Sequence, residues 1–136
     1  VVLCIGMNAG RPGTTLEEYS KEVVKMMESA LIDLKLLTRK DIDQQNPELP
    51  LYKQYFMHGT SHHLGMDVHD LADRYVPIQE GMVFTCEPGI YIRNENLGIR
   101  IENDILVTEN GPVDLMASIP VEAEEIEELM SVMISE

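Results

Sequence analysis

A chain of 136 residues with 44% hydrophobic side chains has the size and composition of a single domain with its own core. Its formal charge of −14 comes from 10 basic and 24 acidic side chains. That balance argues against nucleic acid and anionic membrane as partners, since both require a basic face. Two cysteines, Cys4 and Cys86, make no disulfide framework, so we expect buried thiols and a reducing, cytoplasmic location.

The N-terminal part of the chain predicts two helices. The chain opens in an apolar run without an initiator methionine, so we expect natural sequence upstream of Val1. Residues 1–9 are predicted to end a helix, because two glycines flank a proline within residues 10–13. Thr14 and Glu17 have capping-box spacing, which predicts the start of the next helix. Its apolar positions recur every three or four residues and predict one buried stripe: Leu16, Tyr19, Val23, Met26, Met27, Ala30, Leu31, Leu34 and Leu37.

The second half of the chain is predicted to be mostly strands. Residues 38–50 are polar and predict a connection with a helical turn, and residues 71–79 predict irregular structure. Strands are predicted at 82–87, 90–92, 99–108 and 113–116, with turn residues at 94–98 and 110–112. An acidic helix is predicted from Pro120 onward, with Ile126, Leu129 and Met130 on its buried side.

All four histidines lie within twelve residues, in the segment HGTSHHLGMDVHD at 58–70. A lone histidine is usually a core or surface residue, but four so close together, separated by two glycines, favour a functional site. The chain has no HExxH, CxxC or GxSxG motif, so zincin, zinc-finger and serine-hydrolase sites have no support.

Two predicted strands each carry a glutamate among apolar residues. Because side chains alternate along a strand, Val83, Thr85 and Glu87 share one face. On the return strand, Arg100, Glu102 and Asp104 likewise share a face. For either strand alone, a solvated sheet face is the favoured interpretation. If the strands pair, however, both glutamates can point into one cavity near the histidines, where charge must be paired or bound to a cation.

We therefore predict a metal site formed by His62, Glu87 and Glu102. Oxygen-rich sites with one imidazole favour harder divalent ions such as manganese. Two such ions, about 3.5–4 Å apart, can activate water and bind a peptide carbonyl together. Three ligands are too few to hold two ions well, and two further carboxylates would bring the negative charges into balance with the positive ones.

The histidine block, GMVFTCEPGIYI and GIRIENDILVTENGP resemble the last three signature blocks of the pita-bread metallopeptidases (family M24), in particular the Xaa-Pro aminopeptidase branch. GRPGTTLEEY and SIPVEAEEIEEL resemble the same family, so the likeness covers nearly the whole chain. The resemblance implies an α+β fold, with helices packed on a curved antiparallel sheet that holds two divalent ions, usually Mn(II). It also implies a peptide substrate with proline in second position, from which the N-terminal residue is released.

The resemblance assigns a role to each candidate residue. His62 corresponds to the metal-binding imidazole and Glu102 to the carboxylate that bridges both ions. Glu87 corresponds to a terminal ligand that also acts as general base towards the attacking water. His58 and His69 correspond to non-ligand histidines that line the substrate site and handle protons or the carbonyl oxygen. Arg100 corresponds to an arginine beside the metal carboxylates, whereas His63 and Cys86 have no assigned role.

The family's two metal-binding aspartates precede the helix that ends here at Asn8. We therefore expect residues 1–136 to be the C-terminal part of one metallopeptidase catalytic domain, without the upstream part that carries those aspartates and without the N-terminal domain. Such a fragment is expected to bind metal weakly or not at all and to be inactive. The alternatives are a prolidase, which accepts only X-Pro dipeptides, and a pita-bread binding protein that has lost catalysis. A homo-oligomer is left open.

Overall fold

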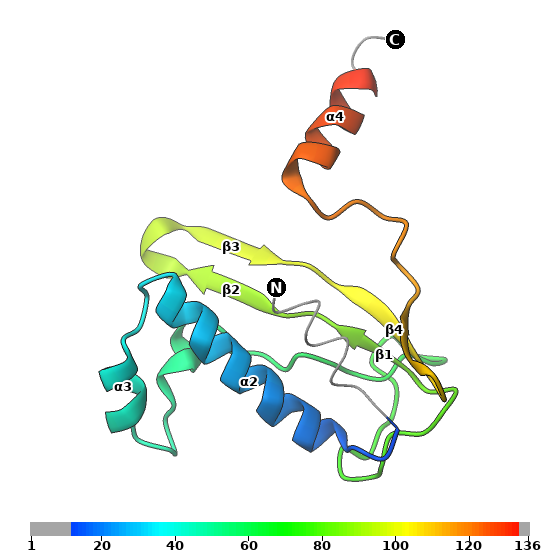
Figure 1. The fold of residues 1–136 in the computed structure, drawn as a ribbon, viewed down its shortest axis with the longest axis horizontal. Helices are drawn as coiled ribbons and strands as arrows, with labels where there is room; N and C mark the ends of the chain where they lie inside the picture. The colour runs from blue at the N-terminus through cyan, green and yellow to red at the C-terminus, as the bar shows by residue number, and fades with distance from the viewer. Residues whose placement is uncertain (1–11, 134–136) are drawn as a thin grey trace.

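The computed structural model describes residues 12–133 and shows an α+β arrangement, as expected (Figure 1). Cys4 and the helix predicted over residues 1–9 lie outside the described residues. Within them, no helix has the length and apolar character needed to cross a bilayer. The helices are α2 (Leu16–Asp33), α3 (Arg39–Gln44) and α4 (Ala123–Met133), with 3-10 turns η1 (Leu51–Gln54) and η2 (Arg93–Glu95). The strands are β1 (Val83–Cys86), β2 (Gly89–Ile92), β3 (Leu97–Arg100), β4 (Asn103–Thr108) and β5 (Gly111–Asp114).

Helix α2 begins one residue later than the predicted capping box. The reciprocal bonds are made by Thr15 and Glu18: the Glu18 N–H donates to Thr15 Oγ1 (3.1 Å), and the Thr15 N–H donates to Glu18 Oε2 (3.0 Å). The box predicted at Thr14 and Glu17 is therefore wrong. Thr14 lies outside the helix, between the turn at Gly13 and the cap at Thr15, and its carbonyl accepts the N–H of Ile78 (2.7 Å).

The predicted apolar stripe of α2 is confirmed over most of its length. Its buried members are Leu16, Tyr19, Val23, Met27 and Leu31. The helix then ends at Asp33, and Leu34 is 56% exposed because it follows the last helical residue. Leu37, which lies beyond the helix, is nevertheless buried at 8% exposure, in a second cluster with Met27, Leu31 and Phe56.

The strands form two antiparallel ladders that follow one another along a single long hairpin. Strand β4 lies between β1 and β5, and β2 pairs with β3. The paired residues Cys86↔Asn103 and Gly89↔Arg100 share one register. The ladder is interrupted between these two pairs, so the strand predicted at 99–108 is split in two. Pro88 lies at the interruption and has no N–H to donate to a ladder.

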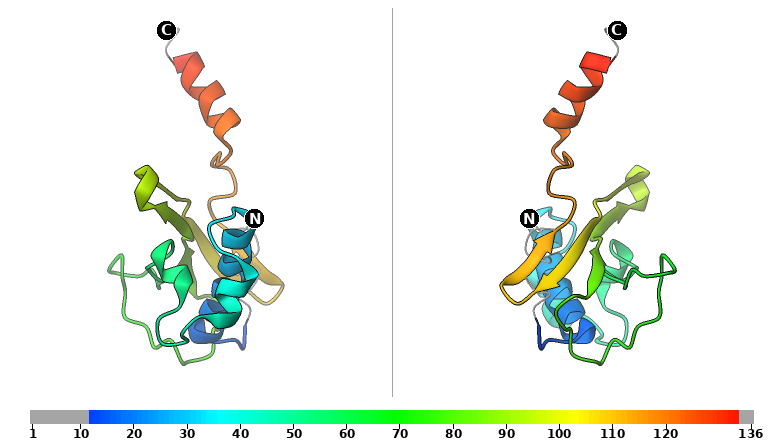
Figure 2. Two further views of the ribbon diagram at one scale, coloured as in Figure 1. Left: turned by 90° about the vertical axis from the view of Figure 1, so that its left-hand side faces the viewer. Right: turned by 90° about the vertical axis from the view of Figure 1, so that its right-hand side faces the viewer.

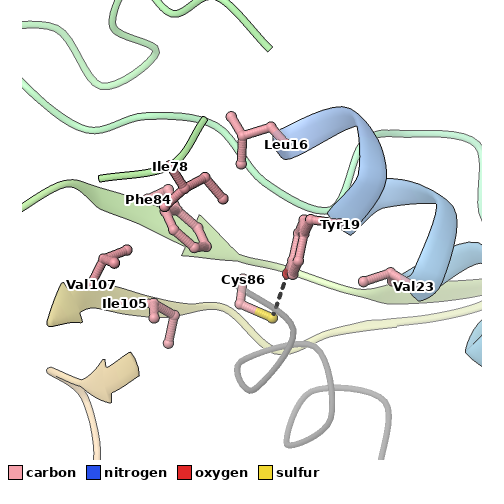
Figure 3. Packing of buried hydrophobic residues seen from close by; sticks show 8 residues of the cluster. All are labelled: Leu16, Tyr19, Val23, Ile78, Phe84, Cys86, Ile105 and Val107. Carbon is pink, nitrogen blue, oxygen red and sulfur yellow. Dashed lines mark hydrogen bonds between the residues drawn. The ribbon is translucent and has the colours of Figure 1, made fainter. Parts of the chain in front are cut away.

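Helix α2 packs across the β1–β4 ladder, and this contact forms the main core (Figure 3). The Tyr19 and Phe84 rings meet edge to face with centroids 5.8 Å apart. The cluster draws on α2, β1, β4 and the segment before β1: Leu16, Tyr19, Val23, Ile78, Phe84, Cys86, Ile105 and Val107. Cys86 is fully buried there, as predicted, and accepts a hydrogen bond from the Tyr19 hydroxyl (3.3 Å). Burial, followed by the proximity of Cys86, raises the pKa of Tyr19.

Helix α4 differs from the prediction in what it buries. Its apolar side chains Ile126, Leu129 and Met130 are 39%, 55% and 58% exposed. These side chains are exposed because α4 stands clear of the sheet and no other described element packs on it (Figures 1 and 2). The prediction of a buried side is therefore wrong for this structure, although the helix itself is confirmed.

Candidate metal centre

The loop that carries His62 runs along the free edge of β1. The Thr85 N–H donates to the His62 carbonyl (2.9 Å), and the Glu87 N–H donates to the Thr60 carbonyl (2.8 Å). An isolated β-bridge between His63 and Phe84 continues the same pairing. The loop therefore behaves as a short extra strand, and this places His62 beside the end of β1, where Glu87 follows.

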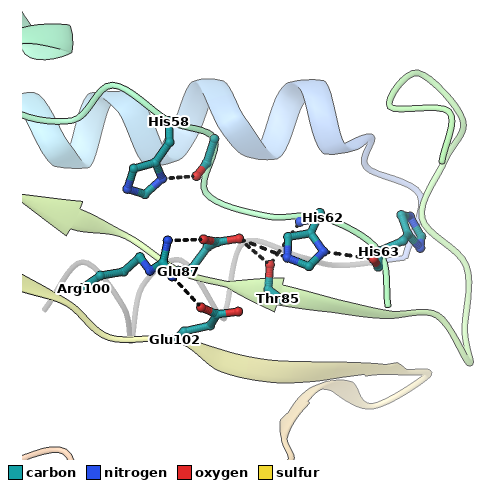
Figure 4. A network of polar contacts seen from close by, with 8 residues as sticks. His58, His62, His63, Thr85, Glu87, Arg100 and Glu102 are labelled. Atoms are coloured by element: carbon teal, nitrogen blue, oxygen red, sulfur yellow. Dashed lines mark hydrogen bonds and ion pairs between the residues drawn. The ribbon is translucent and has the colours of Figure 1, made fainter. Parts of the chain in front are cut away.

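Glu87 and Glu102 lie opposite each other at the interruption of the hairpin. Continuing the Cys86↔Asn103 register by one residue brings the two glutamates face to face on the same side. Residues so placed have Cβ atoms about 4.5–5.5 Å apart. One donor atom each from His62, Glu87 and Glu102 lies within 4.8 Å of the other two (Figure 4). The predicted convergence of the three side chains is confirmed.

His62 presents a defined nitrogen to the two acids. Its Nδ1 lies 3.0 Å from the His63 carbonyl oxygen, which can only accept, so Nδ1 carries the proton. The other nitrogen, Nε2, then lies 3.3 Å from Glu87 Oε1. In a neutral imidazole with this tautomer, Nε2 and Glu87 Oε1 present lone pairs to each other, and either a proton on Nε2 or a metal ion between the two atoms relieves that repulsion. The donor set therefore suits a metal ion.

Arg100 lies between the two glutamates. Its Nη1 is 3.4 Å from Glu87 Oε2, and its Nη2 is 3.5 Å from Glu102 Oε2. The guanidinium offsets the repulsion between two carboxylates that face each other across the hairpin. Its side chain is 48% exposed, so water screens part of this attraction. The predicted position of Arg100 beside the carboxylates is confirmed.

The two other histidines with expected roles flank the cluster without joining it. His58 Nδ1 lies 2.7 Å from the Gly59 carbonyl, so the opposite nitrogen, Nε2, accepts a hydrogen bond from the Tyr91 hydroxyl (3.0 Å). The His69 ring meets the His62 ring edge to face, with centroids 4.2 Å apart. Both imidazoles therefore border the site, while His63 contributes only its backbone carbonyl.

The loop that carries His69 is closed by the Asp70 carboxylate. Asp70 Oδ2 accepts the N–H of Met66 (3.2 Å), and Oδ1 accepts the N–H of Leu71 (2.8 Å). A Cβ at Gly65 would overlap this carboxylate, so a side chain there would displace Asp70 from its two hydrogen bonds. The second glycine of the histidine block thus has a steric role, as its place in the sequence suggested.

Two residues of the site were not singled out by the sequence analysis. Thr85 bonds both His62 and Glu87, and Tyr91 bonds His58. Strand alternation already placed Thr85 on the face of Glu87. Continuing that alternation past Pro88 would have placed Tyr91 there too, but the predicted bend at Pro88 and Gly89 concealed it.

The sequence matches a known protein family and named relatives. The model for metallopeptidase family M24 matches residues 2–109. Xaa-Pro aminopeptidase of Escherichia coli (strain K12) is 44% identical over 135 residues, which cover 88% of this chain and 30% of that protein. Human Xaa-Pro aminopeptidase 3 is 39% identical over 131 residues, which cover 88% of this chain and 25% of that protein. The chain thus spans less than a third of the length of these relatives.

Solved structures agree with the sequence matches. E. coli aminopeptidase P with the inhibitor Pro-Leu superposes with a TM-score of 0.82 at 38% identity, covering 99% of this chain and 33% of that one. Zn-substituted E. coli aminopeptidase P in complex with product gives a TM-score of 0.80 at 39% identity, covering 96% and 32%. The helices and antiparallel ladders described above are therefore part of a pita-bread fold, as the resemblance implied.

Proposed function

Because the chain belongs to metallopeptidase family M24, we propose that it forms the C-terminal part of the catalytic domain of a metalloaminopeptidase. Its substrates are peptides with proline in second position, from which it releases the N-terminal residue. The names of the relatives support this substrate class, as does the Pro-Leu inhibitor held by one solved relative. The observation that carries the proposal is the meeting of His62, Glu87 and Glu102 within 4.8 Å.

These three residues fit a divalent cation. They offer one imidazole nitrogen of defined tautomer and two carboxylates, a set that suits manganese. Two ions need further carboxylates, which we assign to the part of the protein outside this chain. The isolated chain therefore binds metal weakly and is inactive.

The side chains of the site divide the work of hydrolysis. Divalent ions bound there supply Lewis acidity, which lowers the pKa of water and polarises a peptide carbonyl. Glu87 accepts the proton of the attacking water, since its carboxylate lies in the cluster and is only 9% exposed. Arg100 keeps the two glutamates together. His58 and His69 border the substrate and handle protons or the carbonyl oxygen.

The test is hydrolysis by the natural full-length protein. Glu87→Gln should lower the rate by about 10²–10⁴-fold, the usual contribution of a general base. Glu95→Gln, which removes an exposed acid in η2, is the matched control and should leave the rate unchanged. An unchanged rate in Glu87→Gln would refute the assignment of Glu87 as the base.

Two further measurements decide between related functions. Release of the first residue from an X-Pro-X tripeptide supports the aminopeptidase, whereas cleavage of X-Pro dipeptides alone would identify a prolidase. A full-length protein without bound metal and without hydrolysis would identify a binding protein. Efficient turnover by residues 1–136 alone would contradict the proposed inactivity of this part.

A further inference from the structure

The pairing between the His62 loop and β1 contains one irregular hydrogen bond. In an antiparallel ladder, a hydrogen-bonded pair of residues exchanges two backbone N–H···O bonds. His62 and Thr85 make the first of these, from the Thr85 N–H to the His62 carbonyl (2.9 Å). The N–H of His62 instead donates to the side-chain hydroxyl Oγ1 of Thr85 (3.1 Å). A hydroxyl thus takes part in the ladder where a carbonyl is usual.

The same hydroxyl also reaches the acid of the site. Thr85 Oγ1 donates its hydrogen to Glu87 Oε1 (3.0 Å), the oxygen that lies 3.3 Å from His62 Nε2. A hydroxyl has one hydrogen, and Thr85 is fully buried, so no water competes for this bond. Because the carboxylate oxygen can only accept and the His62 N–H can only donate, the hydroxyl hydrogen points to Glu87 and a lone pair of the hydroxyl accepts from His62. Figure 4 shows Thr85 between the two side chains.

We propose that Thr85 is a positioning residue that ties His62 and Glu87 into one preorganised pair of metal ligands. The bond to Oε1 restricts rotation of the Glu87 carboxylate and occupies one of its lone pairs, so the remaining lone pairs face the cluster. The bond from the His62 N–H sets the distance between the loop and β1. This inference rests on the proposed function, because it concerns the same metal site.

The hydroxyl, rather than the shape of the side chain, carries this role. Thr85→Val keeps the branched shape and loses the hydroxyl, whereas Thr85→Ser keeps the hydroxyl and loses a methyl group. Partners that orient metal ligands typically contribute 10–100-fold to metal affinity. We therefore expect Thr85→Val to weaken binding by at least about tenfold and Thr85→Ser to stay within about threefold of wild type.

The experiment is a calorimetric titration of the metal-free full-length protein with MnCl₂, with folding checked by circular dichroism. Thr108→Val is the matched control, because that hydroxyl also has two partners, donating to the Gly111 carbonyl (2.6 Å) and accepting the Asn110 N–H (3.3 Å), but lies outside the site. Thr108→Val should bind Mn²⁺ as wild type does. Should Thr85→Val fail to fold, Thr85→Ala removes the same hydroxyl with a smaller side chain and is expected to show the same loss.

The outcomes separate this inference from the function on which it rests. A wild type that binds no Mn²⁺ overturns both. A wild type that binds Mn²⁺, with a folded hydroxyl-free variant of equal affinity, overturns the role of Thr85 and leaves the proposed function standing. Equal losses in Thr85→Ser and Thr85→Val would also overturn it, because the hydroxyl would then not be the cause.

Discussion

Removal of Arg100 should destabilise the metal-free protein through the two glutamates that it bridges. Acid oxygens of Glu87 and Glu102 lie within 4.8 Å of each other, and Arg100 contacts both carboxylates. At that separation two negative charges repel by roughly 3.5 kcal/mol at an effective dielectric constant of about 20, and by about 0.9 kcal/mol in bulk water. Because the side chains of Glu102 and Arg100 are 39% and 48% exposed, the repulsion energy is close to the lower of these two values. We expect Arg100→Met to lower the free energy of unfolding by about 1 kcal/mol.

The assay is urea unfolding at pH 7 in the presence of EDTA, at low ionic strength and in 1 M NaCl. High salt shortens the screening length to about 3 Å, so the loss should shrink there. Arg93→Met is the matched control, because Arg93 makes no ion pair within the described residues. In a Glu102→Gln background the repulsion is absent, and Arg100→Met should then cost little. A loss that is the same in 1 M NaCl, or unchanged in the Glu102→Gln background, would refute the electrostatic reasoning.

Two further predictions concern the loop and the core. Gly65→Ala should displace the Asp70 carboxylate and lower the free energy of unfolding, measured in urea, by on the order of 1–2 kcal/mol. Gly59→Ala is the control, because a Cβ there meets open space, and it should change the free energy of unfolding little. Equal losses in the two variants would contradict the steric role of Gly65. Burial raises the pKa of Tyr19 in the folded state above its ordinary value of 10.0, so the folded protein keeps a proton that the unfolded chain loses. The free energy of unfolding should therefore fall as the pH rises above about 10. The fall should be shallower in Tyr19→Phe, which also loses the hydrogen bond to Cys86. Identical pH profiles for the two proteins would contradict the role of Tyr19.

The residues of the site were readable from the sequence because their chemistry is local. Four histidines within twelve positions favour a functional site, and two predicted strands each show a glutamate among apolar residues. The same holds for α2, whose buried stripe follows from a 3.6-residue period. Each pattern depends on residues a few positions apart, so each can be predicted without long-range contacts.

The start of α2 is a feature that local sequence patterns do not predict. Thr14–Glu17 and Thr15–Glu18 have identical capping-box spacing, so the sequence offers two equal starts. Long-range contacts choose between them: the Thr14 carbonyl bonds Ile78, and Glu17 Oε2 lies 2.9 Å from Arg74 Nε. The second box, at Thr15, is the one that forms.

The sequence alone determined three features of this protein: the candidate metal-binding side chains, the principal helix α2 and the family whose sequence blocks it resembles. The tertiary structure alone decided the shared register that sets Glu87 opposite Glu102, the hydroxyl of Thr85 in the ladder and the exposure of the apolar side of α4. The physical reason is that a periodic pattern specifies which face of an element is apolar, whereas the partner of that face depends on contacts between segments far apart in the chain.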